Sequence, residues 1–280
     1  MYIPKISFLK LIGTSLCNLP VQSYISMNNS KGVFNMESRN FKLDTEWNII
    51  HYPDKPSGFG ILIIGDDRHF VDEKSSFWTQ NEGKAAMLTD LKKAGYTIFY
   101  SNLYRKNWGS RQAIEMAKSL YAHVIRNEII NEKVHIVAEG MGALVAGRLM
   151  QEMGEHIRSS TLINPILSLQ SHLEQEKEHK FFYKKLVKEL ENSHQTERKP
   201  VMNEVLKRNE DIIQDINIPT KIIHILSSGR AYKQSNMLKQ LSIKWQDKDM
   251  PVSISYMLPE KKQSLAKQII RFLKENEQEL

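Results

Sequence analysis

The sequence predicts an α/β fold in which a mostly parallel central sheet carries helices on both faces. Residues 59–64 form a continuous apolar run, which is typical of a strand buried on both faces of a parallel sheet. Residues 134–147 begin with a run of β-branched residues that stops at a turn of small residues, and a helical pattern starts directly after it. Strand and helix patterns alternate along most of the chain, which indicates parallel strands joined by crossover helices.

Length and composition are those of a globular protein. The chain has 280 residues, of which 41% are hydrophobic and 25% are charged, and this fits one large α/β domain. The net charge of +7 is spread evenly, because residues 1–170 carry 19 basic and 16 acidic side chains and residues 171–280 carry 20 and 16. We therefore expect a mixed, solvated surface and no nucleic-acid partner.

The N-terminal residues and the single cysteine of the chain indicate where in the cell the protein is expected. Cys17 is the only cysteine, which excludes an intramolecular disulfide and a cysteine-based zinc cluster and favours a cytoplasmic setting. The first 20 residues are weak as a signal peptide and too short to span a bilayer, so no membrane span is expected. We expect residues 1–38 to form a poorly ordered extension. The alternatives are a targeting segment or a natural start at Met27 or Met36.

The elements that precede the turn follow a regular order. Two strand-like runs within residues 39–52 predict an antiparallel hairpin, and the turn residues at 53–58 lead into the first buried strand. Helical spacing and end signals predict the next elements, which are a helix at about 78–94, a strand at 96–100 and a helix at about 110–130.

The alternation breaks after a further strand at residues 160–163. Residues 170–193 and 201–213 are highly charged and helical in pattern with no strand between them, so we predict a helical lid or cap over residues 167–215. Alternation then resumes within a single domain that spans residues 39–280. Its last elements are a strand at 218–225, a helix at about 231–241, a strand at 252–256 and an amphipathic helix at 260–275.

The central turn reads Ala138-Glu139-Gly140-Met141-Gly142. It is similar to the Gly-x-Ser-x-Gly turn that exposes the nucleophilic serine of α/β-hydrolases. Together with the order of elements, it makes the chain from about residue 39 resemble the α/β-hydrolase superfamily, with a lid like that of the serine aminopeptidase and monoacylglycerol lipase branches. The resemblance implies an α/β-hydrolase fold in which Gly65 belongs to the turn that helps to form the oxyanion hole. Residues 102–110 and 218–220 resemble two further loops of the family.

The same resemblance implies a catalytic serine, acid and histidine, in that chain order. At the serine position stands Gly140, which has no side chain. Residues 226–230, where the acid is expected, contain no carboxylate, and all nine histidines lie at or before His224, so none follows the last strand. The resemblance therefore predicts an α/β-hydrolase frame whose three catalytic positions are vacant.

The remaining candidates belong to a pocket rather than to a complete catalytic set. Pocket and oxyanion-turn candidates are Gly65, Asp66, Glu139, Gly140, Met141 and Gly142. His69 with Asp66 and Asp67 suggests a small acid/base or metal group, but a polar loop is the favoured interpretation, and no metal is expected.

Other residues have simpler interpretations. His135 lies within a strand and fits a packed core histidine, Trp78 and Trp108 fit the lining or cap of the pocket, and Ser227 and Ser228 have no base near them in the sequence. The glycines at 140, 142 and 147 do not fit the spacing of a dinucleotide-binding turn, so no cofactor is expected.

Two functions follow from this pattern. The favoured one is a non-catalytic α/β-hydrolase homologue that binds a small apolar or acyl-type ligand, or a protein partner, in its lidded pocket. The alternative is an esterase, thioesterase or acyl-transfer enzyme with displaced catalytic groups, using Glu139 or His69 with water and an oxyanion hole built from Gly65 and Met141.

Overall fold

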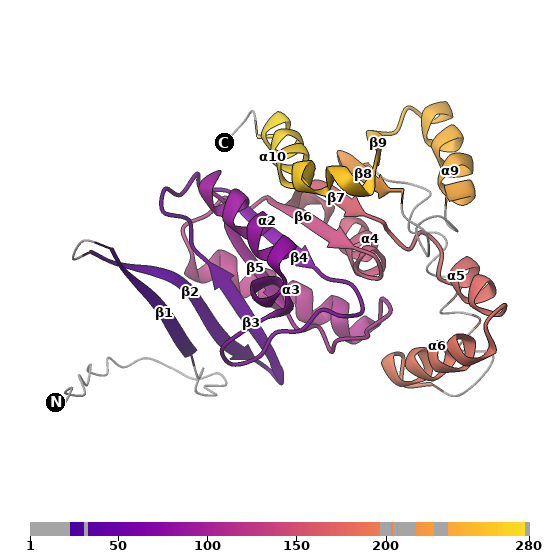
Figure 1. The fold of residues 1–280 in the computed structure, drawn as a ribbon, viewed down its shortest axis with the longest axis horizontal. Coiled ribbons are helices and arrows are strands. Elements are labelled where there is room, and N and C mark those ends of the chain that lie inside the picture. Colours follow the sequence, from indigo (N-terminus) through magenta and orange to yellow (C-terminus); the bar gives the residue numbers. More distant parts are fainter. Residues whose placement is uncertain are drawn as a thin grey trace.

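A computed structural model describes residues 23–30, 33–196, 203, 206, 217–226 and 235–277. A nine-stranded sheet with the order β1-β2-β3-β5-β4-β6-β7-β8-β9 forms its centre (Figure 1). The strands are β1 (Ser23–Ser30), β2 (Val33–Leu43), β3 (Glu46–His51), β4 (Gly60–Ile64), β5 (Thr97–Ser101), β6 (Val134–Glu139), β7 (Ile157–Ile163), β8 (Thr220–Ile225) and β9 (Val252–Met257). From β5 to β9 all neighbouring strands are parallel, as the sequence predicts.

The antiparallel part of the sheet begins earlier than the sequence predicts. The predicted hairpin is present, because β2 pairs with β3 from Ser38–His51 to Leu43–Glu46. The segment expected as part of a poorly ordered extension, however, contains β1 and the first half of β2, which pair with each other antiparallel. Backbone pairing with an edge strand places this segment in the sheet. Residues 1–22 of the expected extension lie outside the described residues.

Helices cover both faces of the sheet. One face carries α3 (Arg111–Asn127), α4 (Gly142–Glu152) and α9 (Ser235–Asp247), and the other carries α1 (Phe77–Gln80), α2 (Glu82–Lys93) and α10 (Leu265–Glu275). The last helix was predicted from residue 260, but residues 259–264 form a 3₁₀ helix before α10. No helix among the described residues is long and apolar enough to cross a membrane.

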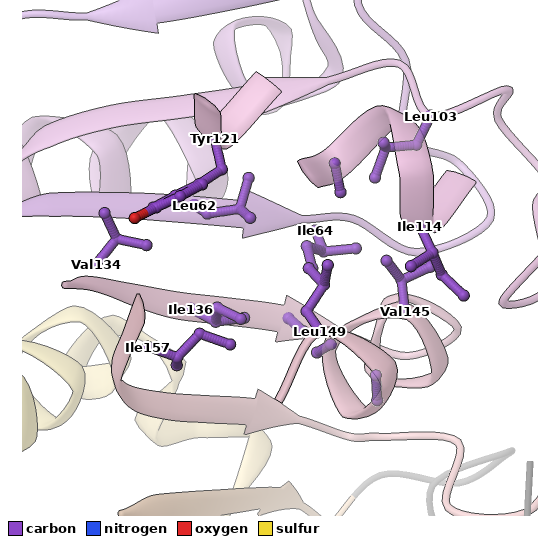
Figure 2. Packing of buried hydrophobic residues seen from close by; sticks show 14 of the residues in the cluster. Leu62, Ile64, Leu103, Ile114, Tyr121, Val134, Ile136, Val145, Leu149 and Ile157 are labelled. Carbon is purple, nitrogen blue, oxygen red and sulfur yellow. The ribbon is translucent and has the colours of Figure 1, made fainter. Parts of the chain in front are cut away.

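The core follows the two-residue period of the strands. On β4, Leu62 and Ile64 pack against α3 and α4, whereas Ile61 and Ile63 pack against α2 and α10. Figure 2 shows the first of these layers, in which Ile64 lies near Ile114 and Leu149, and Leu62 lies beside Tyr121. Both faces of the central strands are therefore buried, and the ends of the strands are left to form a site.

A helical insertion lies between β7 and β8. Its described helices are α5 (Leu169–Glu176) and α6 (Lys180–Ser193), which lie at the periphery of the molecule beyond the carboxyl ends of the parallel strands (Figure 1). The sequence predicts a second long helix at 201–213, but of these residues only 203 and 206 are described, both in helical conformation. The insertion brings charged helices to the edge of the sheet where the candidate site lies.

Candidate functional site

The turn between β6 and α4 has the backbone of a nucleophile elbow. Gly140 has a φ of +53°, a left-handed conformation that costs glycine little and other residues more. Its N–H donates to the carbonyl of Ile163 at 3.0 Å, and its carbonyl accepts from Ile166 N–H at 2.9 Å. A Cβ atom on Gly142 would lie 2.5 Å from the carbonyl oxygen of Ile64, so only glycine allows α4 to start this close to β4.

The carboxyl group of Asp66 stands directly over the elbow. A Cβ atom built on Gly140 would lie 2.3 Å from both Cγ and Oδ1 of Asp66, much closer than non-bonded atoms approach. Oδ1 of Asp66 accepts a hydrogen bond from the backbone N–H of Met141 at 2.9 Å. In a working elbow, the N–H of the residue after the nucleophile stabilises the oxyanion. Here the carboxyl group of Asp66 stands at the nucleophile position and accepts the hydrogen bond of the Met141 N–H group.

His69 is held under the same loop. Its ring packs against Gly65, where a Cβ atom would lie 2.3 Å from Cγ of His69. Nε2 of His69 must carry the proton, because it donates to the carbonyl oxygen of Ser101 at 2.9 Å. Burial lowers the pKa of His69 to about 4; the hydrogen bond to Ser101 acts in the opposite direction, and the charge of Lys84 acts in the same direction as burial. A neutral ring that is only 5% exposed is poorly placed to activate water.

Glu139 forms an ion pair with Lys84. Its Oε2 accepts from Nζ of Lys84 at 2.6 Å, and both side chains are mostly buried. The same ammonium group lies 4.8 Å from the ring centroid of Trp78, a cation–π distance. The ion pair and the aromatic ring together fix the position of Lys84.

A cavity of about 390 Å³ opens beside this ion pair. Its polar wall includes Lys84, Glu139 and Asn164, and the apolar wall includes Met87, Ile225 and Leu265. Glu139, Asn164 and Ile225 come from the carboxyl ends of β6, β7 and β8, the edge at which open α/β sheets bind ligands. We call this space the Glu139 cavity.

Apolar side chains fill the space on the insertion side of the elbow. Met141 is completely buried there, and the backbone N–H of Trp108 donates to its sulfur at 3.2 Å. Nε1 of Trp108 donates to Oε2 of Glu189 on α6 at 3.1 Å, which ties the insertion to the elbow. The buried residues packed with Met141, which we call the elbow cover, are Trp108, Leu144, Ile166, Leu169, Leu186, Leu190 and Leu206.

Asp67 and His135 do not line the Glu139 cavity. Asp67 lines a second cavity of about 430 Å³, together with His69, between the loop after β4 and α6. His135 is fully buried at the opposite end of β6, where Nδ1 lies 2.8 Å from Oγ of Ser159, as expected for a core histidine. Ser227 and Ser228 lie outside the described residues. In the described ranges, no group of three or more His, Cys, Asp or Glu side chains is arranged to hold a metal ion.

Sequence reasoning missed Lys84 and Asn164. Lys84 lies 55 residues before its partner Glu139, so no local spacing connects them. Asn164 ends β7 with a φ of +43°, and its side-chain oxygen accepts from Ile225 N–H at 2.7 Å. The Asn-Pro pair after a predicted strand was the available signal, because asparagine tolerates left-handed backbone at strand ends.

The sheet order, the elbow and the two helical layers define an α/β-hydrolase fold. No protein-family model and no curated protein sequence matches the chain. Several solved structures do match, at low sequence identity. An S-formylglutathione hydrolase from Agrobacterium tumefaciens has a TM-score of 0.64 at 10% identity, over 90% of this chain and 99% of its own.

Two other solved structures are also similar to the chain. The acylaminoacyl peptidase of Pyrococcus horikoshii has a TM-score of 0.61 at 13% identity, over 91% of this chain and 42% of its own, so the chain spans about two fifths of that protein. Est1E from Butyrivibrio proteoclasticus has a TM-score of 0.56 at 9% identity, over 90% and 98% of the two chains. At these identities the likeness establishes the fold, and activity has to be argued from the site.

Proposed function

We propose that this protein is a non-catalytic α/β-hydrolase homologue that binds a small molecule with an apolar, acyl-type body and a polar head. The observation that carries the proposal is the position of Asp66, whose carboxyl group stands where a nucleophile would be and accepts from Met141 N–H. A negatively charged group at this place opposes the negative charge that develops on an oxyanion. The elbow then serves to hold strands and helices together.

The residues available for a displaced mechanism argue against catalysis. Glu139 forms an ion pair with Lys84 at 2.6 Å. His69 is buried, and its Nε2–H donates a hydrogen bond to the carbonyl oxygen of Ser101. Acyl transfer requires a nucleophile within hydrogen-bond reach of a base and beside an oxyanion donor. Neither Glu139 nor His69 is hydrogen-bonded to a serine, threonine or cysteine hydroxyl or thiol within the described residues.

The Glu139 cavity supports the choice of ligand. Its volume of about 390 Å³ falls within the range of small-molecule sites, which extends from roughly 300 to 1,000 Å³. The apolar wall suits a short acyl chain, and Lys84, Glu139 and Asn164 offer a charged or amide partner for the head group. A ligand here would contact the ends of three parallel strands without needing the elbow to open.

A combined binding and activity measurement tests the proposal. Short-chain fatty acids and their amides are expected to raise the melting temperature of the wild type in a concentration-dependent way, because they bind only the folded state. Ala86→Trp, which fills the mouth of the cavity from an exposed position on α2, is expected to remove this effect. Ala122→Trp, on the exposed side of α3, is the matched control and is expected to retain it.

The activity measurement distinguishes the proposed binding protein from an enzyme. We expect no turnover of p-nitrophenyl esters of short or long chain by the wild type, and no covalent labelling by a fluorophosphonate. Turnover together with labelling of a single serine would establish the alternative, an esterase or acyl-transfer enzyme with displaced groups. Stabilisation that Ala86→Trp leaves unchanged would place the ligand elsewhere.

A further inference from the structure

The outward side of α6 carries an exposed pair of aromatic side chains. Phe181 is 74% exposed and Phe182 is 54% exposed. Their rings pack edge to face, with centroids 5.6 Å apart and an interplanar angle of 78°. α6 lies at the periphery of the molecule, away from the sheet (Figure 1). Single exposed apolar residues are ordinary, whereas adjacent exposed aromatics on a projecting helix indicate a contact surface.

Lysines surround this pair. Residues 177–188 contain five lysines and a single glutamate. All five lysines are exposed, and they are Lys177, Lys180, Lys184, Lys185 and Lys188. Lys180, Lys184 and Lys188 form no ion pair with any residue that the structure describes. We call Phe181, Phe182 and the five lysines the α6 tip.

The opposite side of α6 is used by the fold. Leu186 is 5% exposed, Leu190 is fully buried, and both belong to the elbow cover beside Met141. Packing in the protein therefore explains the apolar residues on the inner side of α6 but not Phe181 and Phe182. A basic helix with aromatic side chains on its free side is typical of segments that lie in the interface of a membrane.

We propose that the α6 tip binds peripherally to membrane surfaces that contain anionic lipid. The two phenylalanine rings would enter the boundary between head groups and acyl chains, and the lysines would contact the anionic head groups. The basic side chains are all lysine, whereas protein–protein interfaces are enriched in arginine and depleted in lysine. This surface is independent of whether the elbow is catalytic.

Co-sedimentation of the full chain with vesicles tests the proposal. Binding is expected for vesicles of phosphatidylcholine containing about 30 mol% phosphatidylserine, and not for phosphatidylcholine alone, because the lysines need an anionic surface. Binding is also expected to fall as the salt concentration rises from about 0.05 to 0.5 M, since salt screens exposed charges.

Two variants of the tip and two matched controls complete the test. Phe181→Ser/Phe182→Ser and Lys184→Glu/Lys188→Glu are each expected to raise the lipid concentration for half-maximal binding by at least about tenfold. Ile129→Ser removes an apolar side chain that is 99% exposed elsewhere, and Lys133→Glu/Lys267→Glu reverses two other exposed lysines. Both controls are expected to bind like the wild type. All substituted positions are exposed, so the variants are expected to fold, which circular dichroism checks.

Three results would overturn the proposal. The first is equal sedimentation of the wild type with neutral and anionic vesicles. The second is unchanged binding of both tip variants. The third is concentration-dependent self-association of the wild type, abolished by Phe181→Ser/Phe182→Ser, without any vesicle binding, which would make a second copy of the chain the partner of this surface.

Discussion

The carboxylate of Asp66 accepts a hydrogen bond from the backbone N–H of Met141 at 2.9 Å. This contact joins the loop after β4 to the turn after β6, two segments that are 75 residues apart in the sequence. It also uses the backbone donor that an active α/β-hydrolase reserves for its oxyanion. The elbow of this protein is therefore closed by one of its own side chains, and the consequences can be measured.

Placing a serine at the elbow is expected to cost stability. Gly140→Ser places a Cβ atom 2.3 Å from the Asp66 carboxyl group and puts a non-glycine residue at a φ of +53°. We expect the free energy of unfolding in urea to fall by about 1–3 kcal/mol. Adding Asp66→Gly clears the space, so the double variant is expected to lose less than the sum of the two single losses. Additive losses would mean that the two positions are not in contact.

The second glycine of the turn is expected to be needed for packing. Gly142→Ala would bring Cβ to 2.5 Å from the carbonyl oxygen of Ile64, and backbone atoms cannot move aside easily. We expect a loss of at least about 2 kcal/mol in the free energy of unfolding. Gly83→Ala is the matched control, because it lies in α2 and its Cβ would meet only the Asn81 side chain, at 3.6 Å.

That control variant is expected to gain stability, by about 0.5–1 kcal/mol, since alanine favours a helix more than glycine does. A tolerated Gly142→Ala would show that α4 can move away from β4, and the close approach of these two elements would then not constrain the turn.

The ion pair between Lys84 and Glu139 is expected to contribute modestly. A double-mutant cycle with Lys84→Met and Glu139→Gln is expected to give a coupling energy of about 1 kcal/mol, because both side chains are mostly buried. The coupling should shrink in high salt. A coupling energy of zero at low salt would show that the pair forms without stabilising the fold.

Stability is expected to fall between pH 6.5 and pH 4. Burial lowers the pKa of His51 to about 3 and that of His69 to about 4. Both are neutral when folded but gain a proton below pH 6.5 when unfolded, so the stability they provide is present above pH 6.5 and is lost as the pH falls through this window. Each histidine adds at most about 1.4 kcal/mol per pH unit to the slope of the unfolding free energy against pH.

Unfolding in urea at several pH values checks this slope. His51→Gln removes one titrating group and is expected to flatten the dependence of the unfolding free energy on pH. An identical slope in the wild type and His51→Gln would show that His51 does not lose its charge on folding.

The sheet and its helices were predictable because each rests on a local pattern. The apolar run at β4, the elbow sequence at 138–142 and the helical spacing of α3 all depend on residues close together in the chain. The edge strand β1 was not predicted, because most of its residues are polar and it is placed by its antiparallel pairing with β2.

The closed state of the elbow was only partly predictable. Glycine at position 140 is visible in the sequence, and Asp66 was a pocket candidate, but no spacing rule places the carboxyl group of Asp66 over Gly140. That contact depends on β4 and β6 being neighbours in the sheet with Ile64 opposite Ala138. The Lys84–Glu139 pair depends likewise on where α2 packs, which the sequence pattern does not specify.

Chemical rescue of Asp66→Ala tests most directly whether the Asp66 carboxylate occupies the anion site of the elbow. The variant is expected to lose about 1–3 kcal/mol, because Met141 N–H is left without its partner, whereas Asp67→Ala is expected to be nearly neutral. The measurement is the free energy of unfolding of Asp66→Ala with formate and with formamide at equal ionic strength. We predict that formate, and not formamide, restores stability to Asp66→Ala and leaves the wild type unchanged. Equal effects of formate on both proteins, or none on the variant, would contradict the account.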